Sequence, residues 1–319
     1  MKVGMDVSAL AQTRAGTARY VKALLRELPD VRRLSFGGPG RASTLVRETL
    51  WYPLVLRRAR VDVLHCPTYR GPLHPRVPLV VTVHDLAVFR HPEAFNRWTR
   101  TYSRRVVPRV VRAASRVIAV SDFTRRELVE LLGVSHDRIR VVPNGVEDDF
   151  APEGPTADGD YVLAVGTLEP RKNLDRLVAA ARRADVELRV VGARGWGGVR
   201  VAGNGVRWLG EVPDEELARL YRGALCLAYP SLYEGFGIPV LEAMACGTPV
   251  VTSAGGATEE VAGGAAVLVD PLDPAAIAGG IEQAVGRRDE LRRRGLERAR
   301  RFTWADAARA TEAVYREVA

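Results

Sequence analysis

Residues 161–191 read YVLAVGTLEPRKNLDRLVAAARRADVELRVV, and this stretch decides the fold class. A short apolar run at Tyr161–Val165 is followed by a helical pattern and then by a second apolar run at Val186–Val191. A strand, a helix and another strand in this order form a βαβ unit, whose two strands lie parallel in one sheet. The stretch therefore predicts an open α/β domain built on a parallel sheet.

The same alternation runs along the rest of the chain, with one interruption. Residues 148–160 (DDFAPEGPTADGD) are rich in Pro, Gly and Asp and have no hydrophobic periodicity, so they are predicted to be an interdomain linker. Two doubly wound domains follow from this pattern, and ligands of such sheets bind outside the carboxyl ends of the strands. The predicted strands are Lys2–Met5, Val61–His65, Leu79–His84, Arg116–Val120 and Ile139–Val142 before the linker, and Tyr161–Val165, Val186–Val191, Val206–Leu209, Ala224–Tyr229, Pro249–Thr252 and Ala266–Leu268 after it.

Composition excludes several classes of protein. Of the 319 residues, 47% are hydrophobic and 27% are charged, which is typical of globular domains and not of a disordered chain. The three cysteines, Cys66, Cys226 and Cys246, are too few for a disulfide framework and have no metal-ligand spacing. No apolar run suits a signal peptide or a membrane-spanning helix. We expect a cytoplasmic protein, at the inner face of the membrane if it docks there.

The net charge of +9 belongs to one half of the chain. Residues 1–150 carry 26 basic and 14 acidic side chains, a net charge of +12, whereas residues 151–319 carry 21 and 24, a net charge of −3. Such an excess fits nucleic acid, an anionic membrane surface or an anionic substrate. Because only the first half is basic, the charge does not by itself mark a site in the second half.

Residues 231–251 (SLYEGFGIPVLEAMACGTPVV) hold two acidic side chains, Glu234 and Glu242, with seven residues between them. In one continuous helix they would lie roughly 80° apart around the axis, so Glu234 is better placed in the glycine-rich loop. The helix is then expected to begin at Pro239 and to end before Gly247, which puts Glu242 in its first turn. Alternatively, Glu234 is a solvated loop acid and Glu242 an acid favoured by the helix dipole.

The start of this helix also predicts what kind of ligand binds. Unpaired backbone N–H groups attract phosphate or sugar oxygens, and glycine lets the backbone approach a ligand closely. A carboxylate beside a diphosphate is repelled unless it accepts hydrogen bonds from hydroxyl groups, so the segment favours a nucleotide sugar. The loop is completed by Phe236 and Gly237, and the N–H groups predicted to face the ligand are those of Ile238, Val240 and Leu241.

A second segment follows the strand that ends at Val165. Gly166 turns the chain there, and Arg171 and Lys172 are expected at the start of the next helix. Cations in that position oppose the helix macrodipole, so a bound anion explains them better than chance does. Solvated surface charges are the alternative.

Two weaker signals lie in the first half. Gly16 follows the first strand and could admit a phosphate at a helix start, or it could be an ordinary turn. His84, in Val83-His84-Asp85, ends a strand, where it could hydrogen-bond a sugar hydroxyl or polarise a leaving group. His65 ends another strand and is the second candidate, although a lone histidine is more often structural.

Taken together, these segments resemble the retaining glycosyltransferases of family 4, and the resemblance covers nearly the whole chain. It implies an α/β fold of the GT-B type, with two Rossmann-like domains facing each other across a deep cleft. Residues 1–147 would bind the acceptor and residues 148–302 the nucleotide sugar, and a C-terminal helix at about residues 303–319 would pack back on the first domain. The motifs are the pair Glu234 and Glu242, GxLxxRKN at Gly166–Asn173, TVHDL at Thr82–Leu86, AVSDFTRREL at Ala119–Leu128, VVPNGV at Val141–Val146 and LGEVPDEEL at Leu209–Leu217.

The resemblance also implies the reaction: a hexose moves with retention from a nucleotide-diphosphate sugar to a glycan, lipid-linked or small-molecule acceptor. GDP-mannose is favoured over UDP- and dTDP-sugars. No metal and no other cofactor is implied, because two cations supply the charge that a metal would supply. The implied roles are ribose binding by Glu242, donor-sugar binding by Glu234 with the backbone of Phe236 and Gly237, diphosphate stabilisation by Arg171 and Lys172, a backbone contact from Gly16 and a sugar contact from His84.

Three other functions fit parts of the sequence. A glycosidase also uses two carboxylates but needs no Arg-Lys pair for a diphosphate. A nucleotide-sugar epimerase of the same fold remains the nearer alternative, and an assay of nucleotide release with and without acceptor separates the two. A nucleic-acid-binding protein would explain the basic charge but not the acidic pair, so we expect no nucleic-acid partner. The oligomeric state is not predicted.

Residues 97–116 (RWTRTYSRRVVPRVVRAASR) carry seven arginines among apolar side chains. One hypothesis is peripheral docking on an anionic membrane, where lipid-linked sugar acceptors reside. The alternative is an ordinary helix with a solvated face and an inward apolar face. Pro108 is expected to kink the helix.

Overall fold

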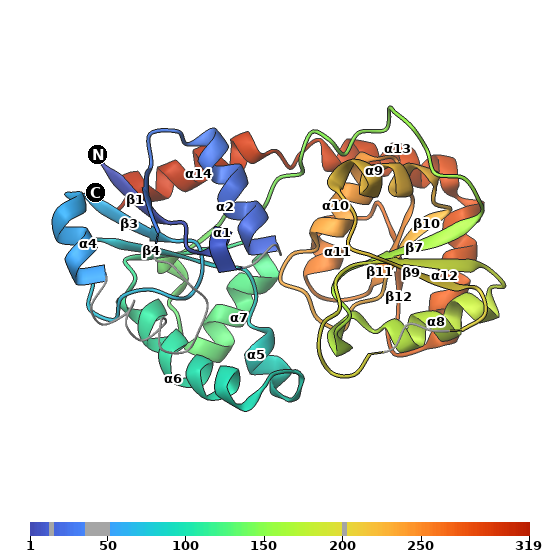
Figure 1. Ribbon diagram of the computed structural model, residues 1–319, viewed down its shortest axis with the longest axis horizontal. Coiled ribbons are helices and arrows are strands. Elements are labelled where there is room, and N and C mark those ends of the chain that lie inside the picture. The colour runs from blue at the N-terminus through green and yellow to red at the C-terminus, as the bar shows by residue number, and fades with distance from the viewer. Residues whose placement is uncertain (13–15, 36–51, 200–202) are drawn as a thin grey trace. The chain divides into compact units, whose positions relative to one another are not determined.

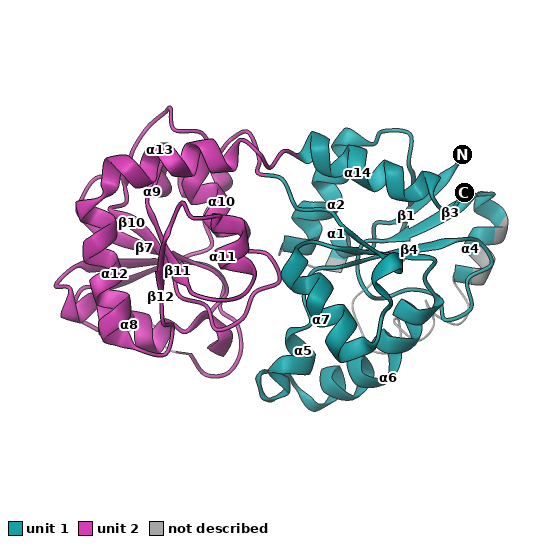
Figure 2. Ribbon diagram, turned by 180° about the vertical axis from the view of Figure 1, so that it is seen from behind, with its two compact units in different colours: residues 1–145, 304–319 teal, residues 146–303 magenta. Residues whose placement is uncertain are grey.

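The computed structural model describes residues 1–12, 16–35, 52–199 and 203–319. These residues form two compact units, coloured separately in Figure 2: unit 1 comprises Met1–Gly145 and Trp304–Ala319, and unit 2 comprises Val146–Thr303. The chain therefore leaves unit 1 once and returns to it with its last helix.

Unit 1 is built on a six-stranded sheet with the order β2-β1-β3-β4-β5-β6, in which all neighbours pair parallel. The five predicted strands are present, and β2 is an additional edge strand. Its three residues include two exposed arginines, which gave no apolar run to detect. The strands are β1 (Val3–Asp6), β2 (Arg32–Leu34), β3 (Val63–Cys66), β4 (Leu79–Val83), β5 (Arg116–Ala119) and β6 (Ile139–Val141).

The helices of unit 1 form where the sequence supplies caps and apolar faces. Ser121 caps α7 by accepting a hydrogen bond from the Thr124 N–H at 3.0 Å. Pro108 lies inside α6, which continues through it. The described helices are α1 (Ala9–Gln12), α2 (Gly16–Glu27), α4 (Tyr52–Ala59), α5 (Ala87–Arg90), η2 (Pro92–Ala94), α6 (Arg97–Ala113), α7 (Asp122–Leu132), η3 (His136–Arg138) and α14 (Trp304–Arg316).

Unit 2 repeats the architecture with the sheet order β12-β11-β10-β7-β8-β9, again parallel throughout. Helices cover the sheet on both sides (Figure 1). Its strands are β7 (Tyr161–Val165), β8 (Glu187–Val191), β9 (Val206–Gly210), β10 (Cys226–Tyr229), β11 (Val250–Ser253) and β12 (Val267–Val269), and its helices are η4 (Pro170–Lys172), α8 (Leu174–Arg183), α9 (Asp214–Gly223), α10 (Ile238–Ala245), α11 (Ala257–Ala262), α12 (Pro274–Gly286) and α13 (Arg288–Ala299).

The strand order of unit 2 contains one reversal. The chain runs from β7 outward to β8 and β9, then returns to β10 beside β7 and runs outward the other way to β11 and β12. The loops that follow two such neighbouring strands diverge and leave a crevice, the usual ligand position in open α/β sheets. The segments 166–173 and 230–237 are these two loops.

The predicted linker is irregular in structure but is packed on unit 2. Phe150 is buried, with its ring 5.9 Å from that of Tyr221 on α9. The Ala157 N–H donates to the Arg219 carbonyl at 3.1 Å, so the same segment follows α9 further along. Within the described ranges, no helix has both the length and the apolar character needed to cross a membrane.

Candidate active site

Hydrogen bonds link the two loops at the switch point of unit 2 to each other. The Arg171 carbonyl accepts from the Leu232 N–H at 2.8 Å, and the Asn173 side-chain amide donates to the Pro230 carbonyl at 3.0 Å. Asn173 adopts a left-handed conformation with φ of 59°. Arg171 and Lys172, predicted at the start of a helix, lie in the short 3₁₀ helix η4 that directly precedes α8.

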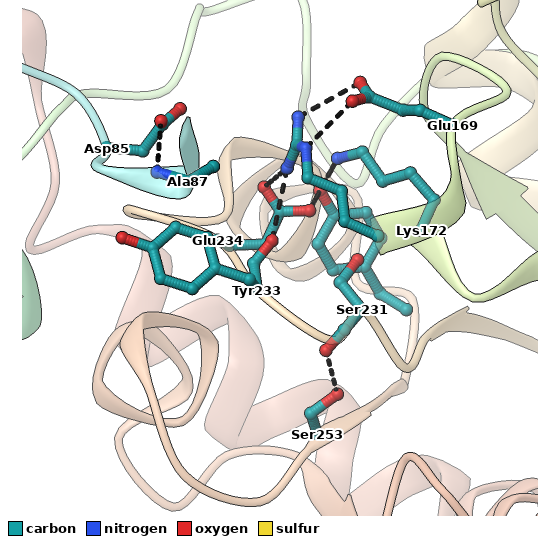
Figure 3. Close-up of polar contacts among 10 residues, drawn as sticks. Asp85, Ala87, Glu169, Lys172, Ser231, Tyr233, Glu234 and Ser253 are labelled. Atoms are coloured by element: carbon teal, nitrogen blue, oxygen red, sulfur yellow. Dashed lines mark hydrogen bonds and ion pairs between the residues drawn. The ribbon is translucent and has the colours of Figure 1, made fainter. Parts of the chain in front are cut away.

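The loops bring Glu234, Arg171 and Lys172 into one cluster (Figure 3). The Arg171 Nη1 donates to Glu234 Oε2 at 2.7 Å, and the Lys172 Nζ donates to Glu234 Oε1 at 2.6 Å. The hydroxyl of Tyr229, the last residue of β10, donates to the same Oε1 at 2.9 Å. One carboxylate thus sits between two cations, with Lys172 and Glu234 each only 10% exposed.

A second carboxylate holds Arg171 from its other nitrogens. Glu169 accepts from Nε of Arg171 at 3.0 Å and from Nη2 at 3.1 Å, and Glu169 is buried. Both oxygens of Glu169 are thereby used in a bidentate pair, the strongest arrangement between these two side chains.

These contacts shift the pKa of the charged groups. Burial alone would raise the pKa of Glu234, but the charges of Arg171 and Lys172, with their hydrogen bonds, outweigh it and lower this pKa to about 2. Burial lowers the pKa of Lys172, and the charge of Glu234 opposes that shift. Burial, with the neighbouring charge of Glu234, raises the pKa of Tyr229 well above its usual value, so Tyr229 stays a hydrogen-bond donor.

Glycine makes room for this cluster. Gly166 has φ of +148°, and a Cβ there would lie 3.0 Å from Cε of Lys172. Gly192, after β8, packs against Gly166 so closely that a Cβ would lie 2.0 Å from the Gly166 carbonyl oxygen. The glycine predicted from the motif is therefore needed for the position of Lys172.

The second acidic residue, Glu242, is held apart from the first. It lies in α10 beyond the first turn, and not within that turn as predicted, because the helix begins at Ile238. Glu242 is buried and accepts from the Tyr221 hydroxyl at 3.0 Å. Burial, together with Glu242, raises the pKa of Tyr221 well above its usual value, so the tyrosine keeps its proton.

The helix α10 begins at Ile238, one residue before the predicted Pro239, and this changes the backbone donors. The Val240 N–H bonds to the Gly237 carbonyl at 3.0 Å, so it does not face outward as predicted. With this start, α-helical geometry also aims the Leu241 N–H at Gly237, which leaves Ile238 as the predicted donor without an intrahelical acceptor. Gly237 has φ of +111°, and Phe236 is buried with its ring 6.1 Å from that of Phe302.

In unit 1, Tyr20 of α2 contacts His84, which directly follows β4. Its ring lies 4.8 Å from the His84 ring in an edge arrangement. His84 Nε2 is 2.9 Å from the Pro67 carbonyl, which can only accept, so Nε2 carries a proton and Nδ1 of the neutral ring is an acceptor. Gly16 is the first residue of α2, and Thr13–Ala15 before it lie outside the described residues.

The other candidate histidine has a structural role. His65 is buried, and its two ring nitrogens lie 2.7 Å from the Tyr315 hydroxyl and 2.8 Å from Thr82 Oγ1. Burial, with a smaller contribution from His84, lowers the pKa of His65 to about 3. The ring is therefore neutral and is occupied on both sides.

One pair of aspartates with a spacing that could hold a metal lies away from this site. Asp158 and Asp160 are separated by one residue, a spacing that can offer carboxylate oxygens to a metal. They precede β7, whereas the cluster follows it, and five strand residues span about 16 Å. Among the described residues, no group of three or more His, Cys, Asp or Glu side chains is placed to bind a metal ion.

Four residues of the site were missed in the sequence. Glu169 stands two positions before Arg171, and Asn173 directly follows Lys172, so both lay within the motif already noted. Tyr229 is the last residue of a predicted strand that ends at the switch point. Tyr221 had no signal in the sequence, because its contact with Glu242 depends on how α9 and α10 pack.

Comparisons with known proteins agree with this class of fold. The family model described as Glycosyltransferase Family 4 matches residues 1–150, and the model described as Glycosyl transferases group 1 matches residues 146–302. Each half of the chain therefore matches a glycosyltransferase model, and the chain is a GT-B glycosyltransferase.

Two proteins with assigned activities are similar to the chain over most of its length. The chain is 34% identical over 300 residues to O-antigen chain mannosyltransferase B of Escherichia coli, covering 85% of this chain and 77% of that one. It is 35% identical over 278 residues to a D-inositol 3-phosphate glycosyltransferase of Acidothermus cellulolyticus, of whose length it spans 62% and which covers 76% of this chain. The chain belongs to glycosyltransferase family 4.

A solved structure shows the same fold over the full length. The Anabaena protein Alr3699/HepE in complex with UDP and glucose superposes with a TM-score of 0.78, covering 99% of each chain at 19% identity. Low identity with this coverage means that the architecture is shared while most side chains differ.

Proposed function

We propose that this glycosyltransferase moves a hexose, with retention of configuration, from a nucleoside diphosphate sugar to an acceptor. The observation that carries the proposal is the cluster of Glu234, Arg171 and Lys172 at the switch point of unit 2. In it, the two cations neutralise the diphosphate as it leaves, and Glu234 accepts hydrogen bonds from hydroxyl groups of the sugar. Stabilising charge that develops in the transition state is commonly the largest contribution to catalysis.

The nucleotide is held further along the same unit. The Glu242 carboxylate accepts hydrogen bonds from the ribose hydroxyls, and Tyr221 fixes the position of that carboxylate. The backbone at Gly237 and Ile238 approaches the donor, since a left-handed glycine leaves that surface without a side chain.

GDP-mannose is the donor that we favour, because the relative from Escherichia coli is a mannosyltransferase. The Anabaena neighbour was solved with UDP and glucose, so UDP-glucose is the main competitor, and a dTDP-sugar is the third choice. No metal takes part: Arg171 and Lys172 take its place at the diphosphate.

Unit 1 supplies the acceptor side of the reaction. Nδ1 of His84 accepts a hydrogen bond from a sugar hydroxyl, and the backbone at Gly16 contacts the diphosphate. A glycan, a lipid-linked sugar and a small phosphorylated polyol are the acceptor classes to test, since the two relatives are named for an O-antigen chain and for inositol 3-phosphate.

The experiment that tests this function follows transfer from GDP-mannose, UDP-glucose and a dTDP-hexose in the presence of EDTA. We expect one donor to be turned over and EDTA to leave the rate unchanged, with the product's anomeric configuration, read by NMR, equal to that of the donor. Glu234→Gln should abolish most of that turnover. A product of inverted configuration, or activity that returns only with a divalent ion, would contradict the proposal.

The acceptor is further proposed to be reached at an anionic membrane surface, through α6. Arg97, Arg104, Arg105, Arg109 and Arg112 of this helix are exposed, and the helix contains no acidic residue. Trp98 is 38% exposed and stacks on Tyr102, with ring centroids 6.2 Å apart, so an aromatic side chain accompanies the charges.

Co-sedimentation with vesicles tests this docking. Vesicles of phosphatidylglycerol and phosphatidylcholine should bind the protein at low salt and release it at high salt, and pure phosphatidylcholine should not bind it. Replacing Arg104 and Arg105 by Gln should weaken binding. If anionic vesicles fail to bind the protein at low salt, the docking proposal is wrong, while the transfer reaction is unaffected.

A further inference from the structure

We infer that Glu169 is a positioning residue of the transfer reaction: it holds the guanidinium of Arg171 in one orientation, so that Nη1 stays directed at the reacting groups. The inference rests on the proposed function, because it assumes that Arg171 contacts the diphosphate. None of the motif roles above includes Glu169.

The geometry divides the guanidinium between two carboxylates. Glu169 takes one edge of the fork, with Nε at 3.0 Å and Nη2 at 3.1 Å. The remaining nitrogen, Nη1, donates to Glu234 Oε2 at 2.7 Å and to the Tyr233 carbonyl at 3.2 Å. Two parallel bonds on one edge of a rigid planar group fix both its place and its plane.

The two carboxylates also differ in how far their side chains are buried. The Glu169 side chain is 5% exposed, against 10% for Glu234 and 17% for Arg171. A carboxylate at that depth is costly unless it is paired, and breaking such a pair leaves an uncompensated charge. Glu169 therefore depends on its bidentate pair with Arg171.

The bonds between Glu169 and Arg171 become important when the donor binds. The diphosphate must take hydrogen bonds from Arg171 Nη1 and Lys172 Nζ, which now go to Glu234, and Glu234 then turns to the sugar. During this exchange Arg171 loses its bond to Glu234 but keeps both bonds to Glu169. Without Glu169, the guanidinium loses both bonds on its Nε–Nη2 edge at the step when its position counts.

The net charge of the cluster predicts a distinctive effect of Glu169→Gln on nucleotide binding and on kcat. The cluster holds two carboxylates and two cations, so Glu169→Gln raises its net charge by one. Binding of the free nucleoside diphosphate should then be unchanged or tighter, while kcat should fall on the order of 10- to 100-fold, because the donor is bound but Arg171 is misplaced. A side chain that only stabilised the fold would weaken binding and turnover together.

A double-mutant cycle tests whether Glu169 acts through Arg171. We compare kcat of the wild type, Glu169→Gln, Arg171→Ala and the double variant, with thermal unfolding recorded for each. Glu169→Gln should lower kcat in the wild-type background and change it less than about twofold in the Arg171→Ala background. Glu187→Gln is the matched control, since Glu187 binds Nε and Nη2 of Arg189 at 2.9 and 3.3 Å with the same sequence spacing, at the opposite end of the sheet.

The outcomes separate the inference from the proposed function. Equal losses of kcat from Glu169→Gln in both backgrounds, or no loss in either, would overturn the positioning role alone. An Arg171→Ala variant with wild-type turnover would overturn the proposed role of Arg171 itself. If Glu169→Gln does not fold, Glu169→Asp, which keeps the charge but shortens its reach, enters the same cycle with the same criterion of non-additivity.

Discussion

At the scale of single residues, the charge of Glu234 is maintained by its partners. Three side chains donate to its two oxygens, and two of them are cations. A buried carboxylate without such partners would take up a proton at neutral pH. The site is thus prepared for a ligand that brings negative charge and hydroxyl groups together.

This arrangement predicts how stability changes with acid. The pKa of Glu234 is lowered from 4.5 to about 2 in the folded protein, so between these values the unfolded chain binds more protons. The contribution of Glu234 to stability should be complete above about pH 4.5 and should be lost as the pH falls towards 2. Denaturant unfolding of the wild type and Glu234→Gln across this range measures it: the difference between their free energies of unfolding should shrink with acid, and a constant difference would contradict the assignment.

The two ends of the donor site are predicted to respond differently to substitution. Glu242→Ala removes hydrogen bonds to the ribose and should weaken nucleotide binding by roughly 10- to 100-fold, since a bond to a charged group contributes about 1.5–3 kcal/mol. Lys172→Ala should reduce kcat on the order of 100- to 1,000-fold, with a smaller effect on nucleotide affinity. Calorimetric titration and initial rates distinguish them, and equal, negligible effects of both would refute the roles.

At the residue level, the sequence placed the charged residues of the cluster in the loops that follow two strands. Glu234 lies 63 positions along the chain from Arg171 and 62 from Lys172, yet the pattern placed both segments after strands, and the topology made those strands neighbours. The N–H of Val240 was assigned wrongly, because it makes a 3₁₀-type bond to the Gly237 carbonyl, three residues back, at the start of the helix. Tyr221 could not be found, since only tertiary packing brings it to Glu242.

At the scale of elements, the loops after β7 and β8 pack through glycine. The Gly166 carbonyl occupies the space where a side chain on Gly192 would begin, and Lys172 occupies the space beside Gly166. The strand pattern itself was readable, because each central strand is a short apolar run between turn residues. The edge strand β2 was not, since two of its three residues are exposed arginines.

Gly192→Ala is therefore predicted to be severe. Its Cβ would meet backbone that cannot rotate away, and its φ of +150° disfavours a side chain, so we expect a loss of more than about 3 kcal/mol in the free energy of unfolding and loss of activity. Gly255→Ala is the matched control, with φ of +77° and nothing within 4 Å, and should cost only about 1–2 kcal/mol. Similar costs for the two, measured by urea unfolding, would mean that the close approach of the loops does not matter.

At the scale of the whole molecule, the last helix completes the first unit. Trp304 and Tyr315 of α14 lie in the core that contains Met5 and Tyr20, and the Tyr315 hydroxyl pairs with His65 across 250 positions of sequence. The chain ends of unit 1 are therefore held together by buried contacts, and unit 1 is not complete at residue 145.

Tyr315→Phe is predicted to destabilise unit 1 by about 1–3 kcal/mol, because Nδ1 of His65 loses its partner in a buried site. Arg316→Ala changes the next residue, whose side chain is exposed, and should have little effect on stability. Limited proteolysis with mapping of the cut sites locates the change: faster cleavage within residues 1–145 is expected for Tyr315→Phe alone. Wild-type resistance in that variant would show that the contact contributes nothing.

Charged side chains are distributed unequally between the two halves of the chain. Unit 2, which carries the ion cluster, lies in the acidic half of the sequence. The basic excess of the first 150 residues is the part of the charge on which the proposed membrane docking depends.

The central claim is that unit 2 binds a nucleoside diphosphate at the switch point of its sheet. Thermal unfolding of the wild type with GDP, UDP and dTDP tests it most directly, because a ligand that binds the folded state raises the unfolding temperature. We predict stabilisation by one of the three, GDP before UDP, and a much smaller shift for Glu242→Ala at the same nucleotide concentration. Failure of all three nucleotides to stabilise the wild type would contradict the account.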